Sequence, residues 1–482
     1  MGNPPPDPIV LRGQGAEVQC VSFATVDGVD CLLSGYAAFG RIPRRLSPRR
    51  PPDHVPSSGP LLTLSPSATH LHSDSNGDVI AWDLALRRPR WRLAAHVPSS
   101  GVLAVGVLTS REEDASRPDD APAARVLTQG RDGSLKCWRV PRGAGDDASV
   151  HMPRTPIWTV ATGSYHFCAF AAHRDAAGDV AAVAAASAAA SGVDVLRFRE
   201  GPDAPPTLHR VLIAPDDTNT GAEQGAEQGA EQAAGGEGRR LGTVMALAFL
   251  PARDGGAPAL VAGYEEGTIA VWDPGLDQPR AGSNPTDDDD DVPAAARTVP
   301  LWRRRVHADA VLSLAVDPRA RGFLSGGADG VVARNDVARD PSTASTTTNN
   351  ATSASISVTR VWSTGPRVPA PGTAGAGIAA VAVRGDARVC AAGGWDGRAR
   401  AYEYAGKSGK KLASLGYHGD VVSAVAFHGD GDADVPGDGD GDGDGDGDGS
   451  ARSKFAGWLA TGSRDGSVAL WPLFPRKKKT PR

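Results

Sequence analysis

Short hydrophobic stretches recur along the chain, each followed by the same arrangement of small and polar residues. A first hydrophobic strand leads to a second that ends in Ser-Gly or Ala-Gly. A turn with Asp and Gly then leads to a third strand that ends in Trp or an equivalent residue. The last copy is the plainest, because Leu459–Trp471 reads LATGSRDGSVALW. Alternating strands joined by Gly-containing turns are typical of antiparallel β-sheets.

Seven copies of this pattern can be counted, and internal repeats decide the architecture of a chain. The last copy also includes Tyr417–Phe427 as its first part. The second to sixth copies are Val102–Val107 with Arg125–Trp138, Tyr165–Phe170 with Ser191–Phe198, Thr243–Phe249 with Leu260–Asp273, Val306–Val316 with Phe323–Asp336, and Gly377–Val383 with Val389–Tyr404.

The first copy is interrupted. Val18–Phe23 and Cys31–Gly35 are in order, and Asp74–Leu84 is the expected continuation. Between them lies Tyr36–Ser73, which is rich in Pro and Arg. Removing this segment would leave an uninterrupted copy. It is therefore either an insertion in a tight turn or the product of a retained intron or mispredicted exon, and in neither case a separate domain.

A sheet with two hydrophobic faces needs a neighbour on each side, and seven such sheets satisfy one another by closing into a ring. We therefore predict an all-β fold, a seven-bladed WD40 β-propeller that forms one domain over residues 8–474. Pro8–Leu11 is predicted to pair with Val468–Trp471 as the outer strand of the last blade, which removes an exposed sheet edge.

Long low-complexity loops are predicted to separate the strands. They contain too little apolar surface to offset the entropy lost on ordering, so we predict that they are disordered. These loops are Arg111–Ala124, Asp203–Arg240, Pro285–Ala296, Ala338–Ser357 and Gly429–Arg452.

Polar residues recur at fixed places in the copies. In WD repeats, a His before the inner strand, a Ser or Thr on the second strand, an Asp in the turn and a Trp on the third strand can form a hydrogen-bonded set. The Ser or Thr is expected to be Thr128 in the second copy and Thr461 or Ser463 in the last, and the fifth copy has Asn335 in place of Trp. One set per blade indicates a structural role. The structural positions assigned in this way are His96, Asp132, Trp138, Trp272, His307, Asp329, Asp396, His418, Asp465 and Trp471.

Motifs for catalysis or for metal and cofactor binding were sought next. The five cysteines are scattered without a Cys-x-x-Cys pair, and neither His-Glu-x-x-His nor Gly-x-Ser-x-Gly occurs. Asp438, Asp440 and Asp442 have the spacing of a calcium loop, but Gly449 stands where a bidentate Glu is required. We predict that the protein is not an enzyme and has no catalytic residues, cofactor, metal site or small-molecule substrate.

The composition, with 482 residues, a net charge of −5 and 40% hydrophobic residues, is that of a soluble globular protein. No apolar run of about 18 residues indicates a membrane span. No basic stripe interleaved with aromatic residues suggests sequence-specific binding of nucleic acid. The tail 475–482 is basic, and its Arg476, Lys477, Lys478 and Lys479 resemble a nuclear import signal, with a solubilising tail as the alternative. We expect the protein in the nucleus, with the cytoplasm as a second location left open.

Several segments resemble one WD-repeat family in both sequence and order. They are Val10–Gly13, Gly130–Trp138, Tyr165–Phe170, Ala262–Trp272, His307–Val316, Ala392–Tyr402 and Ala460–Trp471. The set includes a Trp in the turn of the sixth copy and a Phe-Cys pair in the third. It resembles the ASTRA-associated protein 1 family, whose animal relative is the G-protein β-subunit-like protein 1. The resemblance implies a non-enzymatic protein linked to the chromatin-associated ASTRA assembly and to the co-chaperone complex that matures phosphatidylinositol-3-kinase-related kinases.

The leading hypothesis is thus a non-catalytic scaffold that binds other proteins, with ASTRA and kinase-maturation co-chaperone subunits as its expected partners. The alternatives are a ubiquitin-ligase substrate receptor and a G-protein β-like signalling scaffold. Trp395–Arg398 matches the W-D-x-R string of cullin-ligase receptors, but there the string ends the third strand and here it precedes that strand. A signalling β-subunit would need a long N-terminal coiled coil, and the first strand is predicted too close to the N-terminus for one.

Overall fold

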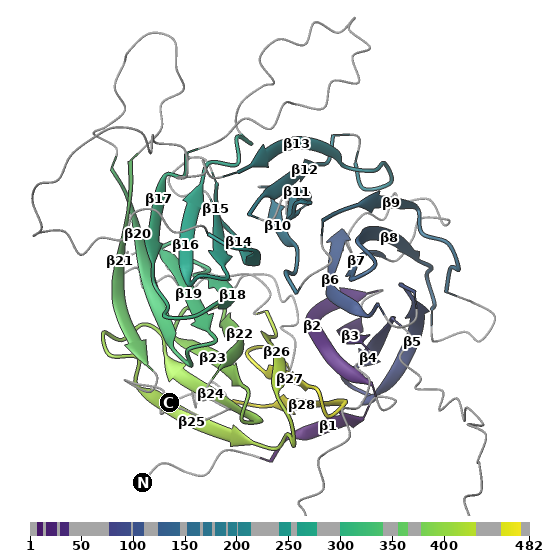
Figure 1. Cartoon of the computed structure of the whole chain (residues 1–482). Helices are drawn as coiled ribbons and strands as arrows, with labels where there is room; N and C mark the ends of the chain where they lie inside the picture. Colours follow the sequence, from purple (N-terminus) through teal and green to yellow (C-terminus); the bar gives the residue numbers. More distant parts are fainter. Residues whose placement is uncertain are drawn as a thin grey trace, which may run out of the picture.

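The computed structural model of the chain describes residues 7–12, 16–26, 29–37, 77–97, 100–109, 124–144, 152–163, 167–175, 179–188, 191–199, 201–213, 241–251, 258–276, 299–340, 355–364, 377–429 and 455–473. These residues form seven four-stranded antiparallel sheets and no helix. The sheets are arranged around a central axis as the blades of a propeller (Figure 1). The predicted seven-bladed fold is confirmed.

Each blade runs from an inner strand near the axis to an outer strand at the rim. Blade 1 comprises β2 (Glu17–Val26), β3 (Val29–Ala37), β4 (Asp78–Asp83) and β5 (Arg88–Ala94); blade 2 comprises β6 (Val102–Thr109), β7 (Ala124–Gly130), β8 (Ser134–Val140) and β9 (Trp158–Ala161). Blade 3 comprises β10 (Ala171–Arg174), β11 (Val180–Ala186), β12 (Val193–Arg197) and β13 (Thr207–Leu212); blade 4 comprises β14 (Val244–Leu250), β15 (Ala259–Tyr264), β16 (Thr268–Trp272) and β17 (Trp302–Arg305). Blade 5 comprises β18 (Val311–Val316), β19 (Gly322–Gly327), β20 (Val332–Asp340) and β21 (Ser355–Thr364); blade 6 comprises β22 (Ile378–Val383), β23 (Val389–Gly394), β24 (Arg398–Glu403) and β25 (Lys411–Gly416). Blade 7 comprises β26 (Val422–Phe427), β27 (Leu459–Ser463), β28 (Ser467–Trp471) and β1 (Ile9–Arg12).

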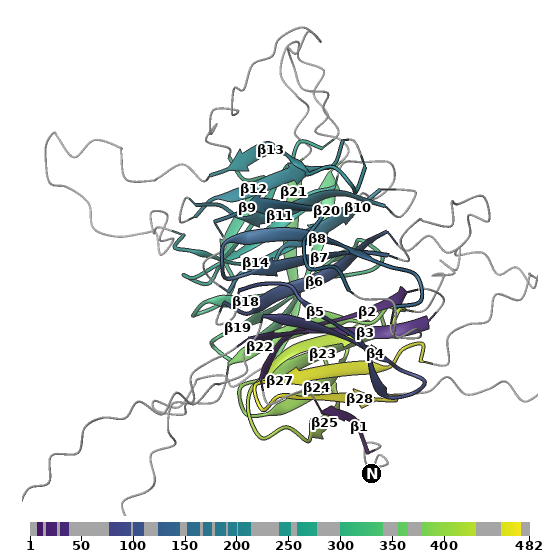
Figure 2. The same cartoon turned by 90° about the vertical axis from the view of Figure 1, so that its right-hand side faces the viewer.

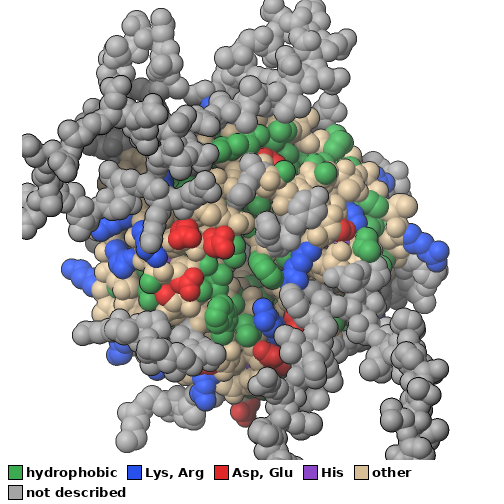
Figure 3. All heavy atoms as spheres, in the orientation of Figure 1, with side chains coloured by type: hydrophobic (Ala, Val, Ile, Leu, Met, Phe, Trp, Pro, Cys, Tyr) green, Lys and Arg blue, Asp and Glu red, His purple; other side chains and the backbone are tan. Residues whose placement is uncertain are grey.

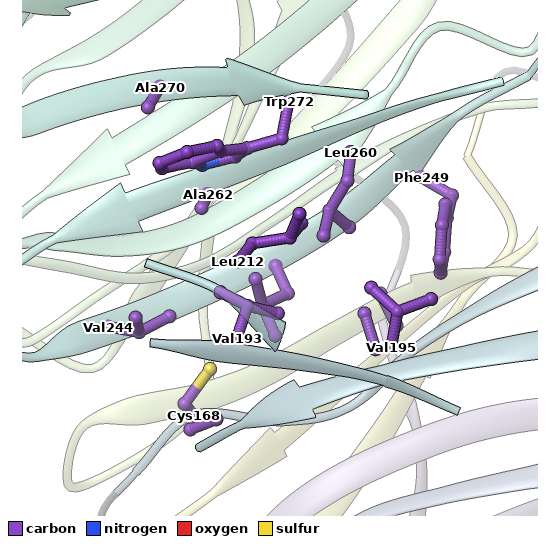
Figure 4. Close-up of a cluster of buried hydrophobic side chains, with 14 of the residues drawn as sticks. Cys168, Val193, Val195, Leu212, Val244, Phe249, Leu260, Ala262, Ala270 and Trp272 are labelled. Carbon is purple, nitrogen blue, oxygen red and sulfur yellow. The ribbon is translucent and has the colours of Figure 1, made fainter. Parts of the chain in front are cut away.

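Hydrophobic side chains fill the space between neighbouring blades. The buried apolar residues fall into seven clusters, one for each pair of adjacent blades. Between blades 3 and 4, Val193 and Leu212 face Val244, Leu260 and Trp272 (Figure 4). Every blade therefore buries both faces of its sheet.

A glycine near the end of the second strand lets adjacent blades approach closely. A Cβ atom at Gly263 would lie 2.6 Å from Cγ1 of Val311, which begins the inner strand of the next blade. The same clash would occur between Gly35 and Val102, at 2.8 Å. The recurring Ser-Gly and Ala-Gly pairs of the sequence are thus explained, because the neighbouring Val occupies the place of the missing side chain.

The first strand closes the ring. β1 pairs antiparallel with β28, with Ile9 opposite Leu470 and Arg12 opposite Ser467. Leu11 is buried in the hydrophobic cluster between blades 7 and 1. Figure 2 shows β1 beside β28 at the edge of the ring. The predicted pairing of the N-terminal strand with the last blade is confirmed.

The third copy differs from the prediction, because Phe167–Phe170, the described part of the predicted inner strand Tyr165–Phe170, is not strand. The inner strand β10 begins only at Ala171. In blade 2, Gln129 stands where most blades have the close-approach glycine, and its Oε1 atom accepts a hydrogen bond from the Phe170 backbone N–H at 2.6 Å. The Gln129 side chain therefore contacts the backbone just before β10, at the position where other blades have a glycine facing a valine.

Two of the predicted loops contain strand. β13 lies inside the predicted loop Asp203–Arg240, and Asp203 forms a bidentate ion pair with Arg125 of blade 2, with N–O distances of 2.6 and 2.5 Å. The ends of Ala338–Ser357 pair with each other, with Ala338 opposite Ser357. The outer strands β13 and β21 were not predicted because they carry charged and small residues, and only one side of an outer strand needs apolar residues.

The predicted boundaries of two other segments also shift. Tyr36 belongs to β3 and pairs with Val18, so the strand continues into the predicted insertion Tyr36–Ser73. Ala124, at the end of the predicted loop Arg111–Ala124, is a buried residue of β7. Residues 38–73 of the insertion, most of the other predicted loop residues and the basic tail 475–482 lie outside the described residues.

The closing strand makes a testable contribution to stability. Leu11→Ala should lower the free energy of unfolding by about 2–5 kcal/mol, because it leaves a cavity in the cluster that joins the chain ends. Leu86→Ala is the control, because Leu86 is 57% exposed. It should change the free energy of unfolding by less than about 0.5 kcal/mol. Urea unfolding of both variants measures the difference, and equal effects would contradict the role of β1.

Candidate interaction surface

In blade 2, four polar side chains form one connected buried set. Nδ1 of His96 lies 3.0 and 3.1 Å from the carboxylate oxygens of Asp132, and Nε2 lies 2.9 Å from Oγ1 of Thr128. The indole N–H of Trp138 donates to the same Oγ1 at 2.9 Å. An ionised carboxylate can only accept, so the network assigns the Nδ1 proton to the histidine. The set ties the loop before the blade to its second and third strands.

Blade 7 repeats this arrangement, but its carboxylate lies farther from the histidine. Nε2 of His418 lies 2.7 Å from Oγ1 of Thr461, which also accepts the indole N–H of Trp471 at 3.0 Å. Nδ1 of His418 lies 3.0 Å from Oγ of Ser467 and 3.5 Å from Asp465. The member of the set is therefore Thr461, and Ser463 instead donates to the backbone oxygen of Asp420.

Blade 5 has the histidine and the carboxylate without the tryptophan. Nδ1 of His307 lies 3.0 Å from Asp329, and Nε2 lies 2.9 Å from Oγ of Ser325. Asn335 is buried at the tryptophan position, and its side-chain N–H donates to the Ala333 carbonyl at 3.5 Å.

Blades 1, 4 and 6 replace the set in different ways. In blade 6, Asp396 forms an ion pair with Arg400 instead of a histidine. In blade 1, the indole N–H of Trp82 donates to Ser34 at 2.9 Å. In blade 4, Trp272 is fully buried and faces Ala262, which has no hydroxyl group. The predicted positions Asp396 and Trp272 are therefore structural without belonging to a histidine set.

The carboxylates of these sets have shifted pKa values. Burial alone would raise the pKa of Asp132, but the hydrogen bonds from His96 and Ser134 and the nearby positive charges lower it overall. The pKa values of Asp329 and Asp465 are lowered for similar reasons. Burial lowers the pKa of His418, which favours the neutral imidazole. These shifts are tied to structural hydrogen bonds, and they recur from blade to blade.

One position of the repeat lies outside these polar sets; its residue is exposed in blades 4, 6 and 7 and partly buried in blades 2 and 5. The turns between the second and third strands, together with the loops that lead into the inner strands, form one face of the ring, which we call the upper face. The residue just before the Asp of each turn lies at the tip of this face. In the described turns it is Arg131, Glu265, Ala328, Trp395 or Arg464 in blades 2, 4, 5, 6 and 7. The chemical variety of this position suits recognition, because the fold does not constrain it.

Three exposed aromatic residues lie on the upper face. Phe167 is 56% exposed, Trp395 is 40% exposed and Tyr417 is 37% exposed. The guanidinium carbon of Arg131 lies 4.6 Å from the centre of the Phe167 ring. Trp395 lies over Gly377, where a Cβ atom would lie 2.5 Å from the indole. Large exposed aromatic side chains are common in protein-binding surfaces.

Charged residues surround these aromatic residues. Glu17 lies between Arg131 and Arg464, and burial raises its pKa while both arginines lower it. Figure 3 shows acidic and basic side chains in separate groups beside hydrophobic ones near the middle of the ring. Arg131, Phe167 and Tyr417 were not predicted as surface residues. The variation of the tip position among the copies was the available signal for Arg131.

The described part of the chain shows no group of three or more His, Cys, Asp or Glu that could hold a metal ion. The described cysteine thiols are protonated, since burial raises the pKa of Cys31 to about 11 and that of Cys168 to about 12. Within the same residues there is no helix long and apolar enough to cross a membrane.

Several proteins named ASTRA-associated protein 1 are similar to this chain over most of its length. The one from Verticillium alfalfae is 26% identical over 432 residues, which cover 83% of this chain and 86% of that protein. The one from Aspergillus niger is 25% identical and covers 89% of this chain and 100% of that protein. The resemblance to ASTRA-associated protein 1 is confirmed.

The guanine nucleotide-binding protein subunit beta-like protein 1 of Mus musculus is also similar, at 25% identity over 49% of this chain and 51% of that protein. No protein-family model matches the chain. Among solved structures, the computationally designed Ika8 protein is similar with a TM-score of 0.44 and 14% identity, over 96% of this chain and 98% of that one.

The shared hydroxyl group of blade 2 allows a direct test of the buried set. Thr128→Ala should lower the free energy of unfolding by about 2–4 kcal/mol, because it leaves His96 and Trp138 without their partner. Thr128→Ser keeps the oxygen and should cost less than about 1.5 kcal/mol. Urea unfolding compares the two, and equal losses would show that the hydroxyl group contributes nothing.

The lowered carboxylate pKa values predict loss of stability in acid. A carboxyl group with a lower pKa in the folded state stabilises the fold above its unfolded pKa of about 3.9, and this stabilisation is lost as the pH falls through the folded-state pKa. The unfolding free energy of the wild type should therefore fall more steeply below about pH 4 than that of Asp132→Asn.

The titration of His418 also destabilises the fold as the pH falls, but at a higher pH than the titration of Asp132. Its lowered pKa means that the unfolded chain takes up a proton first as the pH falls below about 6.5, which destabilises the fold. Urea unfolding over a series of pH values tests both effects. Parallel curves for the wild type and Asp132→Asn would contradict the carboxylate contribution.

Proposed function

We propose that the protein is a non-catalytic scaffold whose upper face binds other proteins. The propeller fold and the similarity to ASTRA-associated protein 1 support a role in protein interaction. In the described blades the recurring polar side chains are engaged in structural hydrogen bonds that repeat from blade to blade, which supports a structural rather than a catalytic role for them.

The exposed aromatic residues are the observation that carries this proposal. Trp395 and Tyr417 both lie at the top of blade 6, because the turn that contains Trp395 contacts the loop that follows Tyr417. A Cβ atom at Gly397 would lie 2.7 Å from the backbone oxygen of His418. Trp and Tyr are the residues most often found at the energetic centres of interfaces. A face with such exposed aromatic anchors suits a protein partner better than a small substrate, which binds in an enclosed pocket.

We further propose that this scaffold is a component of the ASTRA complex, linked to chromatin and to the maturation of phosphatidylinositol-3-kinase-related kinases. The name of the relatives supports membership of the ASTRA complex, and the family resemblance supports the links to chromatin and to kinase maturation. The co-chaperone subunits of that pathway are the proposed partners, and the nucleus is the proposed location.

Affinity purification of the tagged full-length protein, followed by mass spectrometry, tests this function. Trp395→Ala/Tyr417→Ala should reduce recovery of specific partners by about tenfold or more, because each anchor at an interface centre contributes about 2 kcal/mol. Leu86→Ala removes an exposed hydrophobic residue from the opposite face and should change nothing.

The identity of the recovered proteins separates the candidate functions. ASTRA and kinase-maturation subunits would support the proposal, whereas cullin adaptors would favour a ubiquitin-ligase receptor and a γ subunit would favour a signalling scaffold. Thermal unfolding of the double variant should match the wild type. A folded double variant that keeps all partners would exclude the top of blade 6 as the binding site.

A further inference from the structure

Among the described outer strands, β21 of blade 5 is the longest. It has ten residues, whereas β1, β9 and β17 have four each. It lies at the rim of the ring and, in the described part of the chain, pairs with β20 on one side only (Figure 1). Val337–Asp340 of β20 pair with β21 beyond the end of β19. An outermost strand of this kind presents the hydrogen-bonding groups of one edge to a further strand.

Most other outer strands have features that prevent such pairing. β5 contains Pro89, β17 carries three consecutive arginines, and β13 and β25 are each interrupted by a bulge. β21 also has a bulge, at Val361, but Ser355–Arg360 pairs with β20 residue by residue. This segment contains no proline, and Arg360 is its only charged residue. Short length, proline, charge and bulges are the usual protection of a sheet edge, and Ser355–Arg360 has little of it.

The hydrogen bonds of β20 show which backbone groups of β21 point outward. The Val337 backbone N–H donates to the Arg321 backbone oxygen at 2.8 Å, which lies on the side of β19. Val337 is paired with Val358, and backbone groups alternate in direction along a strand. The N–H and C=O groups of Val358 therefore point away from β20, and so do those of Ile356 and Arg360.

These outward groups make the strand complementary to itself. In an antiparallel pair centred on Val358, this residue lies opposite Val358 of a second copy, and Ile356 lies opposite Arg360 in both directions. Each outward N–H group then has a carbonyl group opposite it. Ser357 lies opposite Thr359, and no two like charges are opposite each other, which favours pairing across the strands.

The charged side chain of the segment is bound within its own chain. Nη2 of Arg360 donates to the backbone oxygen of Val306, which follows β17 of blade 4. The guanidinium group is thus directed toward blade 4. Ser357 and Thr359 are exposed and uncharged. Charge repulsion at the edge therefore does not oppose the approach of a second copy.

We infer that β21 pairs with β21 of a second copy of this chain, antiparallel and centred on Val358, so that the two blades form one continuous sheet across a two-fold axis. The second copy is the occupant that the geometry selects, because the same strand supplies both complementary halves. The contact lies at the rim and leaves the upper face of each copy open. The inference thus goes beyond the proposed scaffold function and does not depend on it.

Disulfide cross-linking of the full chain tests the register of this pair. In Ser357→Cys/Thr359→Cys, each new thiol lies opposite a new thiol of the second copy. The Cα atoms of an antiparallel pair without mutual hydrogen bonds are about 4.5 Å apart, which allows a disulfide. Mild oxidation should therefore give a covalent dimer that a reductant reverses.

Ser357→Cys and Thr359→Cys as single variants are the matched controls. Each should give little covalent dimer, because identical positions of the two copies are not opposite each other at these residues. A double variant that forms no more dimer than the single variants would overturn the inference.

Sedimentation velocity over a range of protein concentrations tests the pair without a cross-link. The wild type should shift from its monomer mass of 49.6 kDa toward twice that mass as the concentration rises. Val358→Pro removes one outward N–H group and should stay monomeric, because proline is tolerated at a sheet edge but cannot donate. Val358→Thr keeps the N–H group and should dimerise like the wild type.

Thermal unfolding shows whether Val358→Pro is folded, and the cross-linking result decides the question if it is not. A wild type that stays monomeric throughout, or a folded Val358→Pro that dimerises as strongly as the wild type, would overturn the inference. A partner strand in place of the second copy would leave the purified chain monomeric and would also overturn it. Loss of partner capture by the upper face would instead contradict the scaffold function, so the two proposals fail separately.

Discussion

The contact between neighbouring blades is the interaction on which the structure depends. The middle strands of a blade carry apolar and small residues on both faces, so each sheet needs two neighbours to remove its surface from water. A row of such sheets would leave two exposed faces at its ends, and the ring leaves none. The pairing of β1 with β28 is therefore more than a local strand contact, because it joins the ends of the row. The glycine that faces a valine of the next blade sets how closely the sheets approach.

The hydrogen-bonded polar sets act within single blades. In blades 2 and 7 a threonine hydroxyl connects a histidine and a tryptophan, and this connection holds the loop before the blade against its middle strands. Other blades reach the same result with an Arg–Asp pair or with apolar packing around Trp272. The ring tolerates this variety because packing between blades, and not any one hydrogen-bonded set, supplies most of its stability.

Residues that the repeat does not need for packing or hydrogen bonding are available for binding partners. The residue at the tip of the turn varies among the described blades, with Arg, Glu, Ala and Trp at this position, and it is exposed in blades 4, 6 and 7. Exposed aromatic and charged residues from distant parts of the chain lie on the same upper face, which suits the binding of proteins.

The number of blades, their order and the closing strand could be predicted from the sequence, because the local pattern of hydrophobic strands and turns repeats seven times. The sequence also located the buried polar sets, since each depends on residues at fixed spacing within one copy. It did not reveal β13 or the extended ends of β20 and β21, because an outer strand gains its stability from pairing and needs few apolar residues. Only the three-dimensional fold shows that Arg131 stacks on Phe167, that Gln129 accepts a hydrogen bond from the Phe170 backbone, and that Gly267 lies against the Asp309 backbone. These contacts join different blades, and the separation of their residues along the chain carries no signal of their distance in space.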